Sequence, residues 1–281
     1  MDGSAQIRRL DRADVDHCLR LALDRGWACE RTKWNVLLDV GEGWGFDDRD
    51  GELGGAVILM RYDDVAFIGM LLVRARLGRR GFGRALMAVA LERAGPATVL
   101  LYATAEGRPL YERLGFTEHA AATTYEGRWQ SKMPAKTAQC FRPAQLSAGL
   151  FDQLVAADAQ AFGSRRESLM RGLLRRASGV AVHRANNNLS FAIAWRNIDI
   201  VHIGPVVADT ESGALAVVGA LAGQGRMARI RIDVPEVGPF TGWLSAVGLH
   251  VTDRTPLMRR GYGNAFADLS KFYALAMQAT G

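Results

Sequence analysis

Apolar residues along the first half of the chain change their spacing several times, which predicts alternating strands and helices. Residues 65–73 are almost continuously apolar, as expected for a strand that is buried on both faces of a sheet. Residues 98–102 have the same character. Between these runs, apolar residues recur every three or four positions from Ala85, which predicts an amphipathic helix that stops at Gly95. The centre of this half is therefore predicted to be strand, helix, strand.

Shorter elements are predicted on both sides of this centre. Before it we expect a strand at 6–10, helices at 12–25 and 32–38, and paired strands at 45–47 and 53–61. After it we expect a short helix at 108–114 and a strand from Phe116. Pro109 suits the first turn of that helix, where its missing N–H costs nothing.

The second half of the chain repeats the order of the first. Residues 203–207 correspond to 68–72, and 244–249 correspond to 111–116. The interval between these two segments is nearly the same in both halves. A shared interval of this length indicates a duplicated fold rather than an array of short repeats.

A polar stretch at 131–139 separates the halves. It contains Pro134 and few apolar residues, which is typical of a linker or a surface crossing. The total length of 281 residues also fits two domains of ordinary size. We therefore predict one domain at 1–130 and a second at 139–281.

Composition narrows the class of protein. Apolar residues make up 49% and charged residues 23%, a normal globular mixture. No apolar run approaches the roughly 20 residues that span a bilayer, and no apolar leader is visible, so we expect a cytoplasmic protein without a membrane partner. Cys18, Cys29 and Cys140 lack the spacing of a disulfide framework or a metal site, and no metal is predicted.

The net charge is +6, and the arginines are scattered along the chain with one local cluster. Five arginines stand among glycines, at positions 74, 76, 79, 80 and 84. Such a cluster fits a phosphate-bearing ligand, although a solvated charged face gives the same pattern. No helix–turn–helix, zinc or RNP-type pattern is present, so nucleic acid is not expected as a partner.

The loop at 78–83 has the chemistry of an anion site. Its glycines let the main chain turn tightly and approach a ligand, and successive N–H groups ahead of a helix attract a pyrophosphate. A P-loop is excluded because no Lys-Ser or Lys-Thr follows the glycines. A Rossmann site is excluded because the third glycine of that fingerprint is missing.

Two linked segments resemble known motifs. FIGMLLVRARLGRRGFGRALMAVAL resembles motif A of the GNAT superfamily of N-acetyltransferases, and TAEGRPLYERLGF resembles that superfamily's downstream segment. Together they cover residues 67–116. One position departs from the motif, since Gly78 stands where Gln or Arg is usual. The resemblance implies an α+β fold, in which each half is a mixed, mostly antiparallel sheet flanked by helices.

The resemblance also implies a cofactor and a reaction. Acetyl-CoA would donate its acetyl group to a primary amine of a small molecule by direct attack in a ternary complex. Tyr111 would protonate the departing thiolate, a role that suits a phenol that is neutral at pH 7. The residues that would bind the cofactor are Met70, Leu71, Leu72 and Val73 for its pantetheine arm, and Gly78, Arg79, Arg80, Gly81, Phe82, Gly83 and Arg84 for its pyrophosphate.

The acceptor site is less clear from the sequence. Trp27, Trp34 and Trp44 fall in the region that lines the acceptor pocket in this superfamily, but packing in the core would explain them equally. No general base is evident. The carboxylates available by region are Asp39, Glu42, Asp63, Asp64 and Glu106, each of which also fits a surface position.

The second half lacks the loop and the tyrosine. Residues 210–215 contain one glycine and an acid in place of the arginines, and Leu244 stands at the position of the tyrosine. We therefore expect a degenerate GNAT-like copy that walls the acceptor site, with Arg165, Arg166, Asp233 and Arg259 as residues that face it or lie on the surface. The chain would act as a monomer or a homodimer. The alternative is a non-catalytic acyl-CoA-binding regulatory protein, suggested by Gly78 and the missing base.

Overall fold

A computed structural model describes residues 6–130, 138–186, 188–224, 228–236, 240–262, 268 and 270–281. The predicted linker at 131–139 lies outside these residues except for its last two positions. No helix among the described residues is long and apolar enough to cross a membrane.

The first half follows the predicted order of elements. Its elements are β1 (Arg8–Leu10), α1 (Val15–Asp24), α2 (Arg31–Val40), β2 (Glu42–Asp47), β3 (Leu53–Tyr62), β4 (Val65–Val73), α3 (Phe82–Ala94), β5 (Thr98–Tyr102), α4 (Arg108–Arg113) and β6 (Thr117–Arg128). The strands β4 and β5 have the predicted bounds. The strand β2 begins three residues earlier than predicted, because glycines at 43 and 45 hide the alternation of apolar side chains.

The second half repeats this order. Its elements are β7 (Gln139–Phe141), α5 (Ala148–Phe162), α6 (Glu167–Leu174), β8 (Ala177–Ala185), β9 (Asn188–Asn197), β10 (Ile200–Val207), α7 (Glu211–Gln224), β11 (Arg229–Pro235), α8 (Phe240–Ala246), β12 (Leu249–Arg260) and β13 (Phe272–Ala274). In both halves a parallel pair of strands is joined through a helix, α3 in the first and α7 in the second. The duplication expected from the sequence is confirmed in this order of elements.

The described strands form one continuous sheet. From edge to edge the order is β1-β2-β3-β4-β5-β12-β6-β11-β10-β9-β8-β7, and β13 pairs with β10 beside this path. The pairs β4–β5 and β10–β11 are parallel, and the other described pairs are antiparallel. The mixed, mostly antiparallel sheet that the resemblance implies is therefore confirmed.

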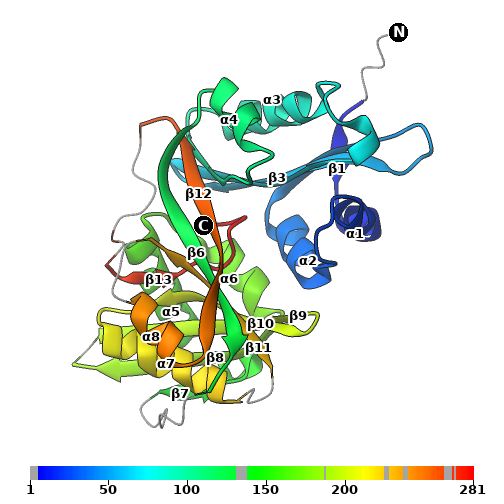
Figure 1. Ribbon diagram of the computed structural model, residues 1–281. Coiled ribbons are helices and arrows are strands. Elements are labelled where there is room, and N and C mark those ends of the chain that lie inside the picture. The colour runs from blue at the N-terminus through cyan, green and yellow to red at the C-terminus, as the bar shows by residue number, and fades with distance from the viewer. Residues whose placement is uncertain are drawn as a thin grey trace.

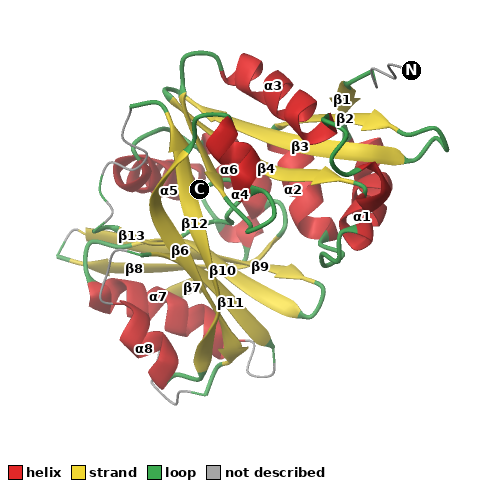
Figure 2. Cartoon of the chain, turned by 45° about the horizontal axis from the view of Figure 1, so that its top comes forward, coloured by secondary structure: helices red, strands yellow, loops and turns green. Residues whose placement is uncertain are grey.

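The two halves exchange one long strand each. The strand β12 of the second half pairs with β5 of the first, with Leu257 opposite Tyr102 and Arg260 opposite Val99. The strand β6 of the first half pairs in turn with β11 of the second. Figures 1 and 2 show β6 and β12 running side by side between the halves. The described strands of the two halves therefore complete each other's sheets.

Helices cover the two faces of the sheet differently. On the outer face, the core beneath α3 and α4 consists mainly of first-half residues together with Met258 of β12, and the core beneath α7 and α8 consists mainly of second-half residues together with Tyr125 of β6. On the inner face, a single core combines residues of α1 and α2 with residues of α5 and α6. The last residues of the chain, 275–279, contribute to this shared core, and Figure 1 shows the end of the chain between the halves.

The helix α2 packs against the second half through a buried polar cluster. The amide of Asn197 on β9 donates to Glu30 Oε1 at 2.9 Å. The ring of His202 on β10 stacks on Trp195, with centroids 4.1 Å apart. The imidazole Nε2 is buried without a partner in the described structure and lies 4.0 Å from Glu30 Oε1. Burial, partly opposed by the charge of Asp233, lowers the pKa of His202 to about 4.

This low pKa makes stability depend on pH. Above the ordinary histidine pKa of 6.5 neither the native nor the unfolded protein protonates His202, so this residue does not lower the free energy of unfolding. Between pH 6.5 and 4 the unfolded chain takes up the proton while the native protein does not. We therefore expect the free energy of unfolding to fall by about 3 kcal/mol between pH 6.5 and pH 4 because of His202. This value is the shift in the pKa of His202 multiplied by about 1.4 kcal/mol per pKa unit.

Urea unfolding at pH 7 and pH 4 measures this effect. The variant His202→Phe keeps a ring on Trp195 but cannot titrate, so its stability should fall less on acidification than that of the wild type. The exposed His250 on β12 gives the matched control, His250→Phe. Equal pH dependence in all three proteins would contradict the expected role of His202.

Candidate functional site

The strands β4 and β5 separate into a V. They pair at three positions, the last of which joins Phe67 to Leu100. Beyond Phe67 no described strand pairs with β4 on its β5 side. Met70 has a φ of 52°, in the left-handed region, at the irregularity in the β3–β4 ladder. The main chain of β4 therefore leaves the sheet's regular ladder where the V opens.

The predicted pantetheine residues form one lip of this V. Met70 and Leu72 are buried, whereas Leu71 and Val73 are half-buried. Because these four residues face a gap in the ladder, their polar main-chain groups on that side remain available to a ligand with amide groups. The structure thus brings all four predicted residues to one strand edge.

The loop at 78–83 presents a row of unpaired amides. Arg79 and Gly81 have φ values of 61° and 86°, and Gly81 is the residue before α3. The left-handed conformation at Gly81 carries no steric cost, because glycine has no Cβ. The N–H groups of residues 79–83 donate to no other described residue. Such a turn before a helix is a concave anion site.

The five clustered arginines fall into two groups. Arg74 pairs with Glu52 at 3.3 Å, and Arg76 pairs with Asp48 at 2.6 Å. Arg79, Arg80 and Arg84 are exposed and form no ion pair with a described residue. The three unpaired guanidinium groups lie on the loop or in the first turn of α3, beside the free amides. This part of the cluster can neutralise a multiply charged phosphate ligand.

Tyr111 on α4 lies beneath the outer face of the same region. Its side chain is 7% exposed and packs edge-on against Phe116 at 6.1 Å. Its hydroxyl lies against Gly107, where a Cβ would be only 2.9 Å from the oxygen. Burial, together with the charge of Glu106, raises the pKa of Tyr111 to about 12. The phenol therefore keeps its proton through the physiological range and can act as an acid.

The three tryptophans proposed for the acceptor pocket are not brought together. Trp34 on α2 is fully buried and Trp27 is half-buried, and both pack in the inner core. Trp44 on β2 packs instead against the outer core, with the guanidinium of Arg93 4.8 Å from its ring centroid. The sheet thus separates Trp44 from the other two.

Four of the five carboxylates considered as bases are engaged elsewhere. Asp39 pairs with Arg176 at 2.6 Å, and Glu106 pairs with Arg25 at 2.5 Å. Glu42 pairs with Arg9, and Asp63 accepts from the main chain of Arg165. Arg166 is neither on the surface nor free, since it is fully buried in an ion pair.

In the second half, β13 lies in the corresponding V between β10 and β11. The strands β10 and β11 pair up to His202 and Arg231 and then separate. Beyond that point β13 pairs with β10, with Val206 opposite Ala274. The next residue, Leu275, donates its N–H to the carbonyl oxygen of Asp233 on β11 at 2.9 Å. Some of the main-chain polar groups of β10 and β11 that face this V therefore already form hydrogen bonds with the chain's own residues.

The loop before α7 also differs from the loop before α3. The hydroxyl of Thr210 accepts from the N–H of Gly213 at 3.2 Å, so the first turn of this helix is capped by a side chain. Leu244, at the position of the tyrosine, is buried in the second outer core. The second half thus has the same order of elements with different residues at these two places.

Four inner-face residues were missed or undervalued in the sequence. Tyr102, Thr124 and Gln278 carry no motif, and Asp233, expected to face the acceptor site or to lie on the surface, is buried. Thr124 Oγ1 donates to Asp233 Oδ1 at 2.6 Å and accepts from Gln278 Nε2 at 3.3 Å.

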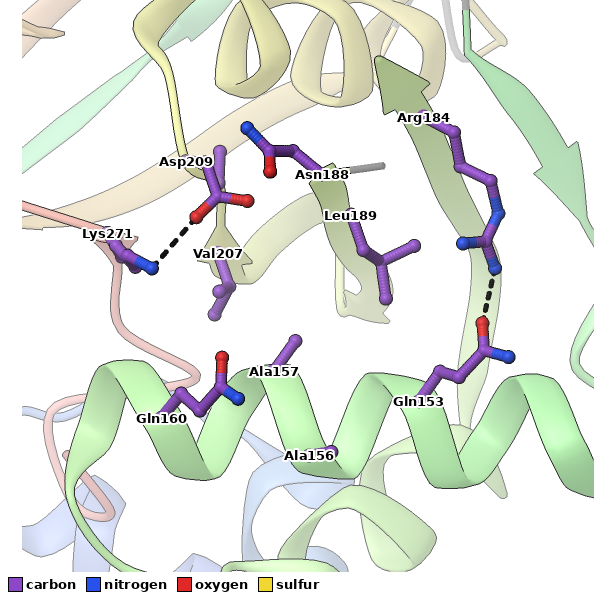
Figure 3. A pocket seen from close by; sticks show the side chains of 11 residues that line it. Gln153, Ala156, Ala157, Gln160, Arg184, Asn188, Leu189, Val207, Asp209 and Lys271 are labelled. Atoms are coloured by element: carbon purple, nitrogen blue, oxygen red, sulfur yellow. Dashed lines mark hydrogen bonds and ion pairs between the residues drawn. The ribbon is translucent and has the colours of Figure 1, made fainter. Parts of the chain in front are cut away.

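A pocket of about 430 Å³ lies in the second half, away from all the predicted residues. Figure 3 shows it between α5 and the ends of strands β8, β9 and β10. Lys271 pairs with Asp209 on one side of it, and Arg184 contacts Gln153 on the other. The loop, the V and Tyr111 lie outside this pocket, so it does not mark the acyl-transfer site.

Family models match both halves of the chain. Residues 41–118 match one model, and residues 154–274 match another, both described as an acetyltransferase (GNAT) domain. The first match contains β4, the loop at 78–83 and Tyr111. The second match includes the V that β13 occupies.

Relatives match over the whole length. The uncharacterized N-acetyltransferase YitH of Bacillus subtilis is 26% identical over 286 residues, which cover 100% of both chains. A structure from Pyrococcus horikoshii, described as a candidate acetyltransferase, superposes with a TM-score of 0.83 at 21% identity over 100% of this chain and 97% of that one. A tandem GNAT protein of the clavulanic acid biosynthesis pathway gives 0.64 at 17% identity, over 93% and 100%. These structures share the fold with this chain.

Proposed function

The chain belongs to the GNAT acetyltransferase superfamily and carries two of its domains in tandem, and from this premise we propose that its first half transfers the acetyl group of acetyl-CoA to a primary amine of a small molecule. The V between β4 and β5, followed directly by a loop of unpaired amides, carries the proposal.

The residues at this site fit coenzyme A. The N–H groups of residues 79–83 and the guanidinium groups of Arg79, Arg80 and Arg84 would hold the pyrophosphate. Gly78 would enter the same turn, and Phe82 and Gly83 would offer the first amides of α3. Residues 70–73 would bind the pantetheine amides along the open edge of β4. The bound cofactor supplies an activated thioester.

The chemistry then needs one bond to form and one to break. The neutral amine nitrogen attacks the thioester carbonyl carbon, the new C–N bond forms, and the C–S bond breaks. The nitrogen loses one proton to solvent water, and the departing sulfur gains one from the Tyr111 hydroxyl. A proton from solvent then restores Tyr111, which its raised pKa favours.

We propose that the second half binds no acetyl-CoA and serves instead to wall the acceptor site. Its V is filled by β13, and the hydroxyl of Thr210 caps the helix where a pyrophosphate would need free amides. A ligand entering there would have to displace a paired strand. The inner core shared by both halves supports the second part of this proposal.

Thermal unfolding with acetyl-CoA tests the cofactor site. Because a ligand that binds only the native state stabilises it, saturation at about 100 times Kd should add about 2.7 kcal/mol and raise Tm by several degrees. The triple variant Arg79→Ala, Arg80→Ala, Arg84→Ala should bind acetyl-CoA about 10- to 100-fold more weakly, because it loses charge-assisted hydrogen bonds.

A matched variant controls for net charge. Arg49, Arg175 and Arg196 are exposed arginines on other parts of the surface, so their replacement by alanine removes the same charge and should leave the affinity nearly unchanged. No rise in Tm for the wild type would refute the cofactor assignment. Binding without release of free thiol, with any amine offered, would favour the non-catalytic alternative.

A further inference from the structure

The pocket in the second half has an apolar floor. Val207 on β10 is buried and Leu189 on β9 is half-buried, and both line the pocket from the side of the sheet. The opposite wall is α5, which presents the small side chains of Ala156 and Ala157. Because these side chains are short, a space of about 430 Å³ remains between the helix and the strand ends. A volume of this size fits a small organic molecule.

An arginine takes the corresponding place in the first half. By the correspondence of the two halves, Asp209 stands at the position of Arg74. The guanidinium of Arg74 lies among carboxylates, 3.3 Å from Glu52 and 3.5 Å from Asp48, and the side chain is only 16% exposed. The second half has an acid at this position and an open pocket beside it. The pocket therefore follows from the residues of the second half and not from the shared order of elements.

Charged groups face each other across the pocket. Figure 3 shows Lys271 and Asp209 on one side and Arg184 on the other. Lys271 Nζ lies 2.9 Å from Asp209 Oδ1, so this end offers a donor and an acceptor whose charges balance. Arg184 donates to the neutral amide of Gln153 and forms no ion pair with a described residue. The described lining thus has one uncompensated charge, which is that of Arg184.

Two glutamines of α5 indicate the length of the site. Gln153 lies on the side of Arg184 and Gln160 on the side of Lys271 (Figure 3). Since they are seven residues apart in the sequence, about 10 Å of helix separates them at 1.5 Å per residue. A chain of about six carbon atoms is shorter than this span and leaves room for the side chains at both ends. Both glutamines are exposed, so the pocket is open to solvent along α5.

We propose that this pocket binds a small organic acid that has one carboxylate and, at the other end of an aliphatic chain, a neutral polar group. The carboxylate accepts from the guanidinium of Arg184, whose planar donors match its two oxygens. The aliphatic chain lies on Val207 and Leu189 and is removed from water. The site shares no residue with those proposed for acyl transfer, so this inference does not rest on that reaction.

The pair of Lys271 and Asp209 selects the group at the far end. A second carboxylate there would be repelled by Asp209, and an ammonium group would be repelled by Lys271. A hydroxyl group both donates and accepts, so it can bind to both side chains without breaking their ion pair. The ligand therefore carries a single negative charge, which matches the uncompensated charge of Arg184.

Isothermal titration calorimetry of the full chain tests this inference, with 6-hydroxyhexanoate as the probe. The wild type should bind it with a Kd of about 1 mM or tighter, as expected for a ligand of this size. The probe 1,6-hexanediol lacks the carboxylate and should bind at least about 10-fold more weakly. Adipate and 6-aminohexanoate carry a charge at the far end and should also bind more weakly than 6-hydroxyhexanoate.

Three variants locate the binding. Arg184→Ala should weaken it about 10- to 100-fold, because the carboxylate loses hydrogen bonds to a charged group. Ala157→Leu should abolish it, since the larger side chain fills the pocket while leucine still favours the helix. Arg196→Ala is the matched control, because it removes the same charge from an exposed position of β9 outside the pocket, and it should bind as the wild type does. Arg184 is exposed, so the test stands even where Ala157→Leu unfolds the protein.

Saturating acetyl-CoA should leave the affinity for 6-hydroxyhexanoate nearly unchanged, because the two sites share no residue. Loss of binding in its presence would place the probe at the transfer site and overturn the inference. No binding to the wild type at about 10 mM probe would also overturn it. Equal affinities of the wild type and Arg184→Ala, or of 6-hydroxyhexanoate and 1,6-hexanediol, would show adventitious binding only and would reject the site. None of these results bears on the acyl-transfer reaction.

Discussion

Replacing Tyr111 by phenylalanine should lower turnover by about 100- to 10,000-fold, the usual contribution of a positioned general acid. The change keeps the ring that packs against Phe116 and removes only the hydroxyl beside Gly107. Without that donor the departing thiolate must take its proton from water. The loss corresponds to about 3–5 kcal/mol of transition-state stabilisation.

The affinity for acetyl-CoA should survive this change. The amides of residues 79–83 and the unpaired arginines are untouched, so Kd should stay within a few-fold of the wild type. Tyr125→Phe is the matched control, because Tyr125 is equally buried but packs in the core of the second half. Turnover of Tyr111→Phe within a few-fold of the control would remove Tyr111 from the mechanism.

The pH profile gives a second measurement of the same role. Since burial and the charge of Glu106 raise the pKa of Tyr111 to about 12, the acid stays protonated up to about pH 11. Ionisation of this tyrosine therefore removes no activity between pH 7 and pH 10. Any alkaline decline that Tyr111→Phe retains must come from another group.

Part of the candidate cofactor site could be predicted because its residues lie close together in the sequence. An anion site made of main-chain amides needs only a contiguous turn before a helix, so glycines at 78, 81 and 83 reveal it. The strands at 65–73 and 98–102 were equally clear, because runs of apolar residues end at turn residues. Tyr111 follows from the same stretch of sequence.

The sequence could not distinguish the arginines around the loop that form ion pairs from those that do not. Arg74 and Arg76 look like Arg79 and Arg80 in the sequence, yet their carboxylate partners at 48 and 52 come from the turn between β2 and β3. Only the folded chain brings these groups together. The distinction between a paired and an unpaired arginine, which decides what can bind phosphate, therefore depends on tertiary contacts.

The exchange of β6 and β12 was not predictable for a different reason. The two strands have equivalent places in a duplicated fold, so either can complete either sheet with the same pattern of apolar residues. The order of elements is the same for an exchanged and an unexchanged arrangement. The sequence therefore predicts two sheets, whereas the structure joins them into one.

The inner-face polar cluster escaped prediction because four distant segments build it. Tyr102, Thr124, Asp233 and Gln278 belong to β5, β6, β11 and the segment after β13. Asp233 pairs locally with Arg231 on β11, but its contact with Thr124 depends on the exchange of strands, which brings β6 and β11 together. A cluster of this kind becomes visible only when the pairing of the strands is known.

The buried ion pair of Arg166 and Asp158 should dominate the stability of the segment that carries Gln278. Both side chains are fully buried, and the guanidinium donates to both carboxylate oxygens, at 2.6 and 2.9 Å. It also donates to the Gly281 carbonyl oxygen at 2.6 Å and lies 3.8 Å from the centroid of the Phe162 ring. One side chain thus fixes α5, α6 and the end of the tail.

Removing one partner leaves an uncompensated buried charge, so Arg166→Met should lower the free energy of unfolding by about 3–5 kcal/mol. The double variant Arg166→Met, Asp158→Leu should recover much of this loss, because two apolar side chains leave no buried charge. Arg165→Met, at the adjacent exposed position, should change stability little. Chemical denaturation measures all three. A loss for Arg166→Met no greater than that for Arg165→Met would show that the buried pair does not stabilise this part of the fold.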